Sequence, residues 1–122
     1  MQENWLKDQM MSKSAKRTYS AYSSDAMHLL GATIRAERKT KKMSEQELAE
    51  RAGVSRSVIQ RVEKGDMTCG VGIVFEVAHI VGIPLFDAEP SRLSSQIRQV
   101  EDKLTLLPKT IHKKKKVIND DF

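Results

Sequence analysis

The pattern of apolar and polar residues between positions 44 and 65 predicts two short helices joined by a tight turn. Ser44 and Glu47 have the S-x-x-E spacing of a capping box, in which each side chain accepts a hydrogen bond from the other residue's backbone N–H. Gly53 suits the turn because glycine adopts a positive φ at little cost, and Gly65 is placed to end the second helix.

The second helix, expected from about residue 56 to residue 63 after the candidate N-cap Ser55, has an apolar and a polar side. Val58, Ile59 and Val62 recur with helical spacing and form the expected buried stripe. Two helices of about two turns each are not stable alone in water, so we expect this stripe to pack on neighbouring helices. The polar positions left facing outward are Arg56, Ser57, Gln60 and Arg61.

Apolar residues at Met27, Leu30 and Ile34 predict a preceding helix over about residues 25–40, with Asp25 at its start. Basic residues are concentrated at its end, where they are favourable against the negative pole of the helix dipole.

Between residues 71 and 81, apolar residues recur at intervals of three and four. This spacing predicts a helix that is buried on most sides, forms the centre of the core and ends at Gly82. β-Branched residues are dense here, so a strand is the alternative, but the length and the spacing favour a helix. Leu85 and Phe86, which follow, are expected to cap the core.

A further helix is expected over residues 89–107, with Pro90 well suited to its first turn. Its apolar residues are spaced by four, three, four and three, which is the a/d seam of a coiled coil lasting only about two heptads. Such a seam either pairs with a second copy or a partner, or docks on its own domain. Its members are Leu93, Ile97, Val100, Leu104 and Leu107.

The two ends of the chain lack a helical or strand period. We expect a flexible N-terminal arm over residues 1–22 and a flexible charged tail over residues 108–122. The tail changes from basic to acidic and ends in Asp-Asp-Phe. It is either a solvated tail or a docking peptide in which Phe122 contacts a partner.

Composition excludes several classes of protein. A low aromatic content suits a small aliphatic core that is all-α, and no run of about 18 apolar residues predicts a membrane span. The N-terminus does not resemble a secretory signal, and the single cysteine, Cys69, cannot form an internal disulfide, so we expect a cytoplasmic protein. Neither a metal-ligand spacing among the histidines nor an enzyme motif is present, so we expect no metal, no cofactor and no enzymatic activity.

Positive charge is distributed unevenly. The net charge of +5 comes from the two flanks, because residues 25–87 are neutral in total. Within that neutral region, residues 35–42 contain five basic residues and one acid. Basic clusters of this kind attract nucleic acid or another anionic surface, although charge alone does not distinguish this role from a solvated surface.

Residues 30–86 resemble the Xre/Cro-type helix-turn-helix domain of bacterial and phage repressors, a lambda-repressor-like fold of five helices around an aliphatic core. The matching strings are LGATIRAERKTKKMSEQELAERAGVS, RSVIQRVEKG and VFEVAHIVGIPLF. The resemblance implies a domain over about residues 23–88, followed in this chain by the extra helix at 89–107. It also implies sequence-specific binding of duplex DNA by a homodimer at an inverted repeat.

In that family the third helix enters the major groove, which assigns base contacts to Arg56, Ser57 and Arg61, with Gln60 beside them. The start of the second helix contacts phosphate, and nearby lysines attract DNA regardless of its base sequence. An acid, Glu45, stands where the family often has glutamine, and a carboxylate repels phosphate. The phosphate-contacting candidates are Ser44, Gln46, Lys41, Lys42 and Lys64. The resemblance further implies a structural pair between Arg38 and Glu63.

A narrower resemblance extends from residue 19 to residue 86 and includes LLPK at 106–109 and the final DDF. It is to the antitoxins encoded beside HipA-family kinase toxins (HipB-like), which repress their own operon as dimers and hold the toxin in a complex. The alternatives are a stand-alone repressor of the Xre family with no toxin partner, and a non-specific nucleic-acid binder that uses the lysines at 113–116.

Overall fold

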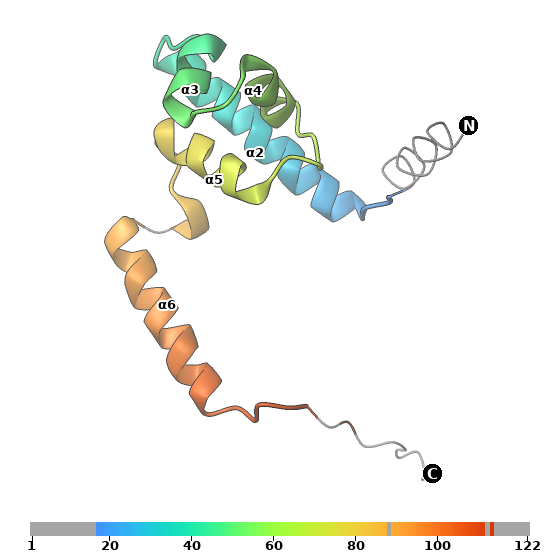
Figure 1. The fold of residues 1–122 in the computed structure, drawn as a ribbon, viewed down its shortest axis with the longest axis vertical. Helices are drawn as coiled ribbons and strands as arrows, with labels where there is room; N and C mark the ends of the chain where they lie inside the picture. Colours follow the sequence, from blue (N-terminus) through green and yellow to red (C-terminus); the bar gives the residue numbers. More distant parts are fainter. Residues whose placement is uncertain (1–16, 88, 112, 114–122) are drawn as a thin grey trace, which may run out of the picture. The chain divides into compact units, whose positions relative to one another are not determined.

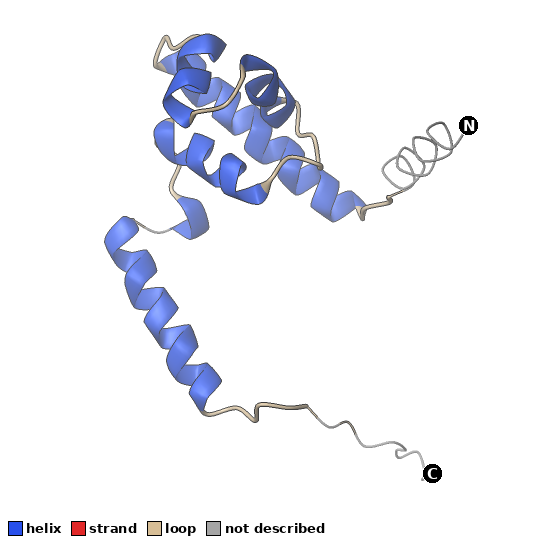
Figure 2. Ribbon diagram, viewed as in Figure 1, coloured by secondary structure: helices blue, strands red, loops and turns tan. Residues whose placement is uncertain are grey.

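The computed structural model describes residues 17–87, 89–111 and 113. These residues form helices and contain no strand (Figures 1 and 2). The chain divides into two compact units between Ile83 and Pro84. The helices are α2 (Ala21–Thr40), α3 (Glu45–Ala52), α4 (Arg56–Glu63), α5 (Val71–Ile80), the 3₁₀ turn η1 (Leu85–Asp87) and α6 (Pro90–Thr105). The expected all-α class with an extra C-terminal helix is therefore confirmed.

The first unit is built around a small aliphatic core. Helix α3 packs on α4 and α5, and α4 also packs on α2, as Figure 1 shows. The residues of this core are almost entirely aliphatic, in agreement with the low aromatic content of the sequence. The buried apolar residues are Ile34, Met43, Leu48, Ala49, Ile59, Val62, Val74, Val77, Ala78 and Val81.

The predicted helix–turn–helix between residues 44 and 65 is confirmed, except that Val58 of the expected buried stripe is only half-buried. The Ser44 side chain accepts from the Glu47 N–H at 3.0 Å, and the Glu47 carboxylate accepts from the Ser44 N–H at 2.8 Å, which completes the capping box. Gly53 adopts φ 72° after α3 and Gly65 adopts φ 79° after α4. Ser55 is the N-cap of α4 by position, but its hydroxyl lies 3.0 Å from that of Ser57 and makes no capping bond.

Close approach of two backbones explains why glycine occupies position 31. A Cβ at Gly31 would lie 2.4 Å from the carbonyl oxygen of Val62, which is far inside van der Waals contact. The absence of a side chain therefore lets α2 and α4 pack directly against each other and sets the position of α4.

Helix α2 begins four residues earlier than the expected start at Asp25. Ser20 is its N-cap, and the Ser20 hydroxyl accepts from the Ser23 N–H at 3.1 Å. Serines at several successive positions all offer capping chemistry, so the apolar pattern alone placed the start one turn too late. The last residues of the predicted arm at 1–22 thus belong to this helix, and residues 1–16 lie outside the described residues.

The expectation that the helix at 71–81 would be buried on most sides was wrong. Helix α5 buries Val74, Val77 and Ala78 on one side, whereas Val71 is 66 % exposed and Phe75 is 37 % exposed. The physical reason is that α5 lies at the edge of a small unit, so its second apolar face has no helix of that unit to cover it.

The second unit contains η1 and α6. Phe86 is 71 % exposed and has φ 57°, and Leu85 is half-buried; the expectation that these two residues cap the core of the first unit stays a prediction. Helix α6 has Pro90 in its first turn, as predicted, but it ends at Thr105 rather than at 107. No helix in the described residues combines the length and apolar character needed to cross a bilayer.

Candidate nucleic-acid interface

The four residues predicted to contact bases all lie on α4. Arg56, Ser57 and Arg61 are exposed, while Gln60 is half-buried. The opposite side of the helix is anchored by Ile59 and Val62, which are fully buried. The structure therefore brings the predicted polar residues together on one outward side of a helix whose other side is fixed in the core.

A buried ion pair fixes α4 to α2. The Arg38 guanidinium donates to Glu63 from Nε at 2.6 Å and from Nη2 at 3.0 Å, and its Nη1 donates to the Met43 carbonyl at 2.8 Å. The hydrogen bonds from Arg38 to Glu63 raise the pKa of Arg38, which outweighs the opposing effect of burial. The structural role expected for this pair is confirmed: it joins α2, α4 and the segment before α3.

Glu45 links two of the predicted base-contacting residues. Its Oε1 atom accepts from Arg56 Nε and from Gln60 Nε2, each at 3.3 Å, and its Oε2 atom lies 3.9 Å from Nη2 of Arg38. Burial tends to raise the pKa of Glu45, but hydrogen bonds from Gln60 and Arg56, together with the charge of Arg38, lower it overall. In this position the acid orients side chains of α4, a role that sequence reasoning missed.

A second acid engages Arg61. Arg61 Nε donates to Asp66 Oδ2 at 2.9 Å, and Nη2 donates to the Thr68 hydroxyl at 2.9 Å. Hydrogen bonds from the Thr68 hydroxyl, from Arg61 and from the Thr68 N–H lower the pKa of Asp66 from 3.8 to about 2. Asp66 and Thr68 lie between two predicted helices, and sequence reasoning missed them. The D-x-T spacing, typical of an Asx turn, is the signal that would have indicated this cluster.

The start of α3 offers donors for an anion. The backbone N–H groups of Glu45 and Gln46 have no acceptor among the described residues, as expected in the first turn of a helix. The N–H of Ser44 donates to Glu47, so the groups at this helix start that remain open to an anion are those of Glu45 and Gln46. Arg35, which sequence analysis included only in a basic run, joins this site. A hollow of about 420 Å³ here is lined by Arg35, Arg38, Ser44, Glu45, Gln46 and Arg56.

The remaining phosphate-contacting candidates have different surroundings. Lys41 lies 3.4 Å from the carboxylate of Glu37 in an exposed i,i+4 pair, and Gln46 donates to Glu50 at 3.2 Å. Lys42 and Lys64 are exposed, at the two ends of the helix–turn–helix segment. Exposed pairs of this kind are weak, so they leave the cations accessible to another anion.

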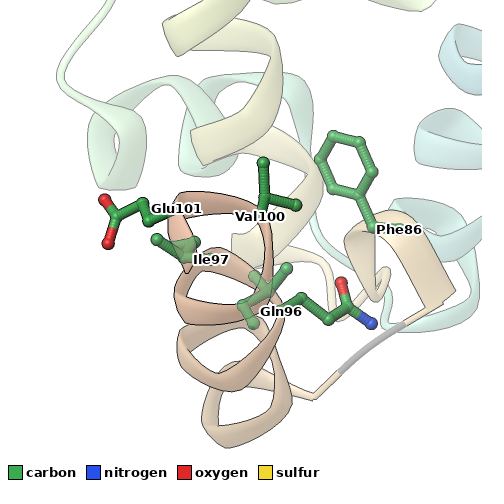
Figure 3. Close-up of a pocket in the computed structure, with 6 residues that line it drawn as sticks. Phe86, Gln96, Ile97, Val100 and Glu101 are labelled. Atoms are coloured by element: carbon green, nitrogen blue, oxygen red, sulfur yellow. The ribbon is translucent and has the colours of Figure 1, made fainter. Parts of the chain in front are cut away.

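The predicted seam on α6 is solvent-exposed within its unit. Ile97 is 56 % exposed and Leu104 is 60 % exposed, and α6 has no buried residue. Leu107 lies two residues beyond the end of the helix, and Phe122 lies outside the described residues. A hollow of about 310 Å³ is lined by side chains of α6 and by Phe86 of η1 (Figure 3). Its lining residues are Phe86, Leu93, Gln96, Ile97, Val100 and Glu101.

The described residues contain no cluster of histidine, cysteine and carboxylate side chains that could hold a metal ion. The polar groups around α4 form two sets, one around Glu45 and one around Asp66, and each includes an arginine of α4.

Comparison with known proteins agrees with this geometry. Residues 34–87 match the family described as Helix-turn-helix. The chain is also 36 % identical over 69 residues to the uncharacterized HTH-type transcriptional regulator y4dL of Sinorhizobium fredii, which covers 57 % of this chain and 35 % of that protein. The chain thus spans about a third of the length of this relative. Residues 34–87 are therefore similar to the helix-turn-helix family, in a chain that is similar over 69 residues to an HTH-type transcriptional regulator.

Proposed function

We propose that this chain is a transcriptional repressor that binds double-stranded DNA at an inverted-repeat operator as a homodimer. One observation carries the proposal. Helix α4 presents Arg56, Ser57, Gln60 and Arg61 on its outward side, while the Arg38–Glu63 pair fixes its C-terminal end to α2. Arginine donates two hydrogen bonds to guanine and glutamine forms an equivalent pair with adenine, so these side chains suit the major groove.

Phosphate binding is supported by the arrangement around α3. The exposed N–H groups at its start and the adjacent Arg35 provide donors and positive charge for a phosphate group. Lys41, Lys42 and Lys64 add further charge on the same domain. Because residues 25–87 are neutral in total, this placement of cations, rather than the net charge of the domain, is the expected source of affinity.

Binding to the DNA upstream of the gene tests the proposal. We expect the chain to prefer this duplex over a scrambled duplex of the same composition. Arg56→Ala is expected to reduce base discrimination by about 1–3 kcal/mol if the arginine makes a bidentate base contact. Arg92→Ala, which removes the same charge from α6, is the matched control. Equal affinity of the parent for both duplexes would reject sequence-specific binding.

The exposed apolar face of α6 supports the homodimer. No residue of α6 is buried, so its apolar side is exposed to water, which is unfavourable in free energy. A second copy of α6 offers a matching apolar face that would cover it. Ile97→Asp combined with Leu104→Asp is expected to convert a dimer into a monomer in sedimentation experiments. Ser95→Asp combined with Gln99→Asp, on the opposite side of the helix, is expected to leave the dimer intact. A dimer that survives both double substitutions would exclude this seam.

The same proposal includes the role of antitoxin in a type II toxin–antitoxin module. In this role the chain represses its own operon in the cytoplasm and binds a HipA-like kinase toxin. It is supported by the resemblance that extends beyond the helix-turn-helix domain to residues 106–109 and to the final DDF. A stand-alone repressor without a toxin is the alternative function.

A neighbouring reading frame that encodes a HipA-like kinase would favour the antitoxin over the alternative. Co-purification with that kinase is expected to weaken when the chain is truncated before Pro108, or when alanine replaces Phe122 of the tail or Trp5, an apolar residue of the predicted N-terminal arm that could dock on a partner. Operator binding is expected to be retained. Co-purification that is unaffected by all of these changes would count against the antitoxin role.

A further inference from the structure

Arg61, Asp66 and Thr68 form a closed ring of hydrogen bonds beyond the end of α4. Arg61 donates from Nε to Asp66 Oδ2 at 2.9 Å and from Nη2 to the Thr68 hydroxyl at 2.9 Å. The Thr68 hydroxyl in turn donates to Asp66 Oδ1 at 2.6 Å, and the Thr68 N–H donates to the same oxygen at 2.8 Å. Each of the three residues therefore contacts the other two.

The contacts of Arg61 occupy one edge of its guanidinium group. A guanidinium carries five N–H donors in a rigid plane, and Asp66 and Thr68 take one from Nε and one from Nη2. Among the described residues no acceptor contacts Nη1. The outer edge, formed by Nη1 and the second hydrogen of Nη2, retains the parallel pair of donors that matches guanine O6 and N7.

The ring is at the protein surface, so its free edge is accessible. The side chains of Arg61 and Asp66 are 46 % and 32 % exposed. Because an arginine side chain otherwise samples many rotamers in water, holding it in one position lowers the entropy lost on binding. An arginine fixed in this way discriminates between base pairs by the geometry of its donors as well as by its charge.

We propose that Asp66 and Thr68 are positioning residues that hold Arg61 as a fixed fork for a guanine in the major groove. This inference rests on the proposed function and names the base that one position of the operator half-site requires. Arg56 lacks an equivalent support, because its contact is a single 3.3 Å bond to a Glu45 oxygen that also accepts from Gln60. The strictest requirement for guanine is therefore at the base pair facing Arg61.

Selection of duplexes from a pool randomised over about 20 base pairs, which spans two half-sites one helical turn apart, tests the inference. The full chain is expected to enrich an inverted repeat with guanine at one position of each half-site. Asp66→Ala and Thr68→Val are expected to reduce the preference for guanine at that position about tenfold or more. Preferences elsewhere in the repeat are expected to be retained.

Three further variants separate positioning from charge and from folding. Thr68→Ser keeps the hydroxyl and is expected to retain the guanine preference, which Thr68→Val loses. Asp25→Ala removes an equal charge from α2 and is expected to leave the preference unchanged. Arg61→Lys removes the fork and is expected to lose the preference at the same position.

Two results would overturn the inference while leaving the proposed function in place. In the first, Asp66→Ala and Thr68→Val select the same repeat as the parent with an undiminished guanine. In the second, Arg61→Lys does so, which would show that the guanine preference does not depend on a fixed guanidinium fork at this position. Failure of the parent to enrich any repeat would instead reject the proposed function, and the inference with it.

Discussion

Replacing Arg38 with methionine is expected to destabilise the helix-turn-helix domain by about 3–5 kcal/mol, because Glu63 would remain buried without its partner. The side chains of Arg38 and Glu63 are 8 % and 3 % exposed. Methionine has a similar length and is apolar, so the change removes the hydrogen bonds while largely filling the space.

The structure supports this magnitude. The change removes two hydrogen bonds between opposite charges, at 2.6 and 3.0 Å, and a third to the Met43 carbonyl at 2.8 Å. Hydrogen bonds to charged groups contribute about 1.5–3 kcal/mol each, so two of them account for the expected loss. Since small domains are stable by only about 5–15 kcal/mol, the variant is expected to be close to unfolding at ordinary temperature.

Urea unfolding followed by far-ultraviolet circular dichroism measures the effect. Arg35→Met, three positions earlier on α2 and exposed, is the matched control and is expected to change the free energy of unfolding little. The double variant Arg38→Met with Glu63→Leu is expected to be less destabilised than the two single variants together, because it leaves no unpaired charge. A loss below about 1 kcal/mol in Arg38→Met, or strict additivity in the double variant, would refute this reasoning.

Three further predictions concern the same domain. Gly31→Ala places a Cβ 2.4 Å from a carbonyl oxygen of α4, so the free energy of unfolding is expected to fall by about 1–3 kcal/mol; an unchanged urea midpoint would contradict this. Ser44→Ala removes the cap of α3 and is expected to cost about 1 kcal/mol in the same assay, whereas no loss would show that the cap is dispensable. The pKa of Asp66 is lowered from 3.8 to about 2 in the folded state, so its contribution to stability is complete above pH 3.8 and lost as the pH falls toward 2. Asp66→Asn is therefore expected to flatten the dependence of unfolding free energy on pH in that window, and an unchanged slope would disprove the assignment.

Local chemistry explains why the helix–turn–helix could be predicted. The capping box of Ser44 and Glu47 and the positive φ of Gly53 are decided by residues within a few positions of one another. The buried stripe of α4 follows from its spacing alone. Caps and helical spacing act over a few residues, so they can be recognised in the sequence without any tertiary contact. They also determine which side of α4 faces outward.

The contacts of the candidate interface could not be predicted in the same way. Glu45 and Arg56 are eleven positions apart, and they meet only because α3 packs on α4. The sequence shows an acid at position 45 where phosphate contact is expected, which suggests repulsion. The structure shows that this acid instead accepts hydrogen bonds from Arg56 and Gln60.

By itself, the sequence determined the all-α class, the capped helices and the residues on the outward side of α4, because caps and helical periodicity act over one or two turns. Only the tertiary structure decided that Asp66 and Thr68 hold Arg61, and that α5 leaves Val71 exposed. These features depend on where a helix ends relative to a loop and on which faces lie at the edge of a small core. Such relations arise only when the chain is packed.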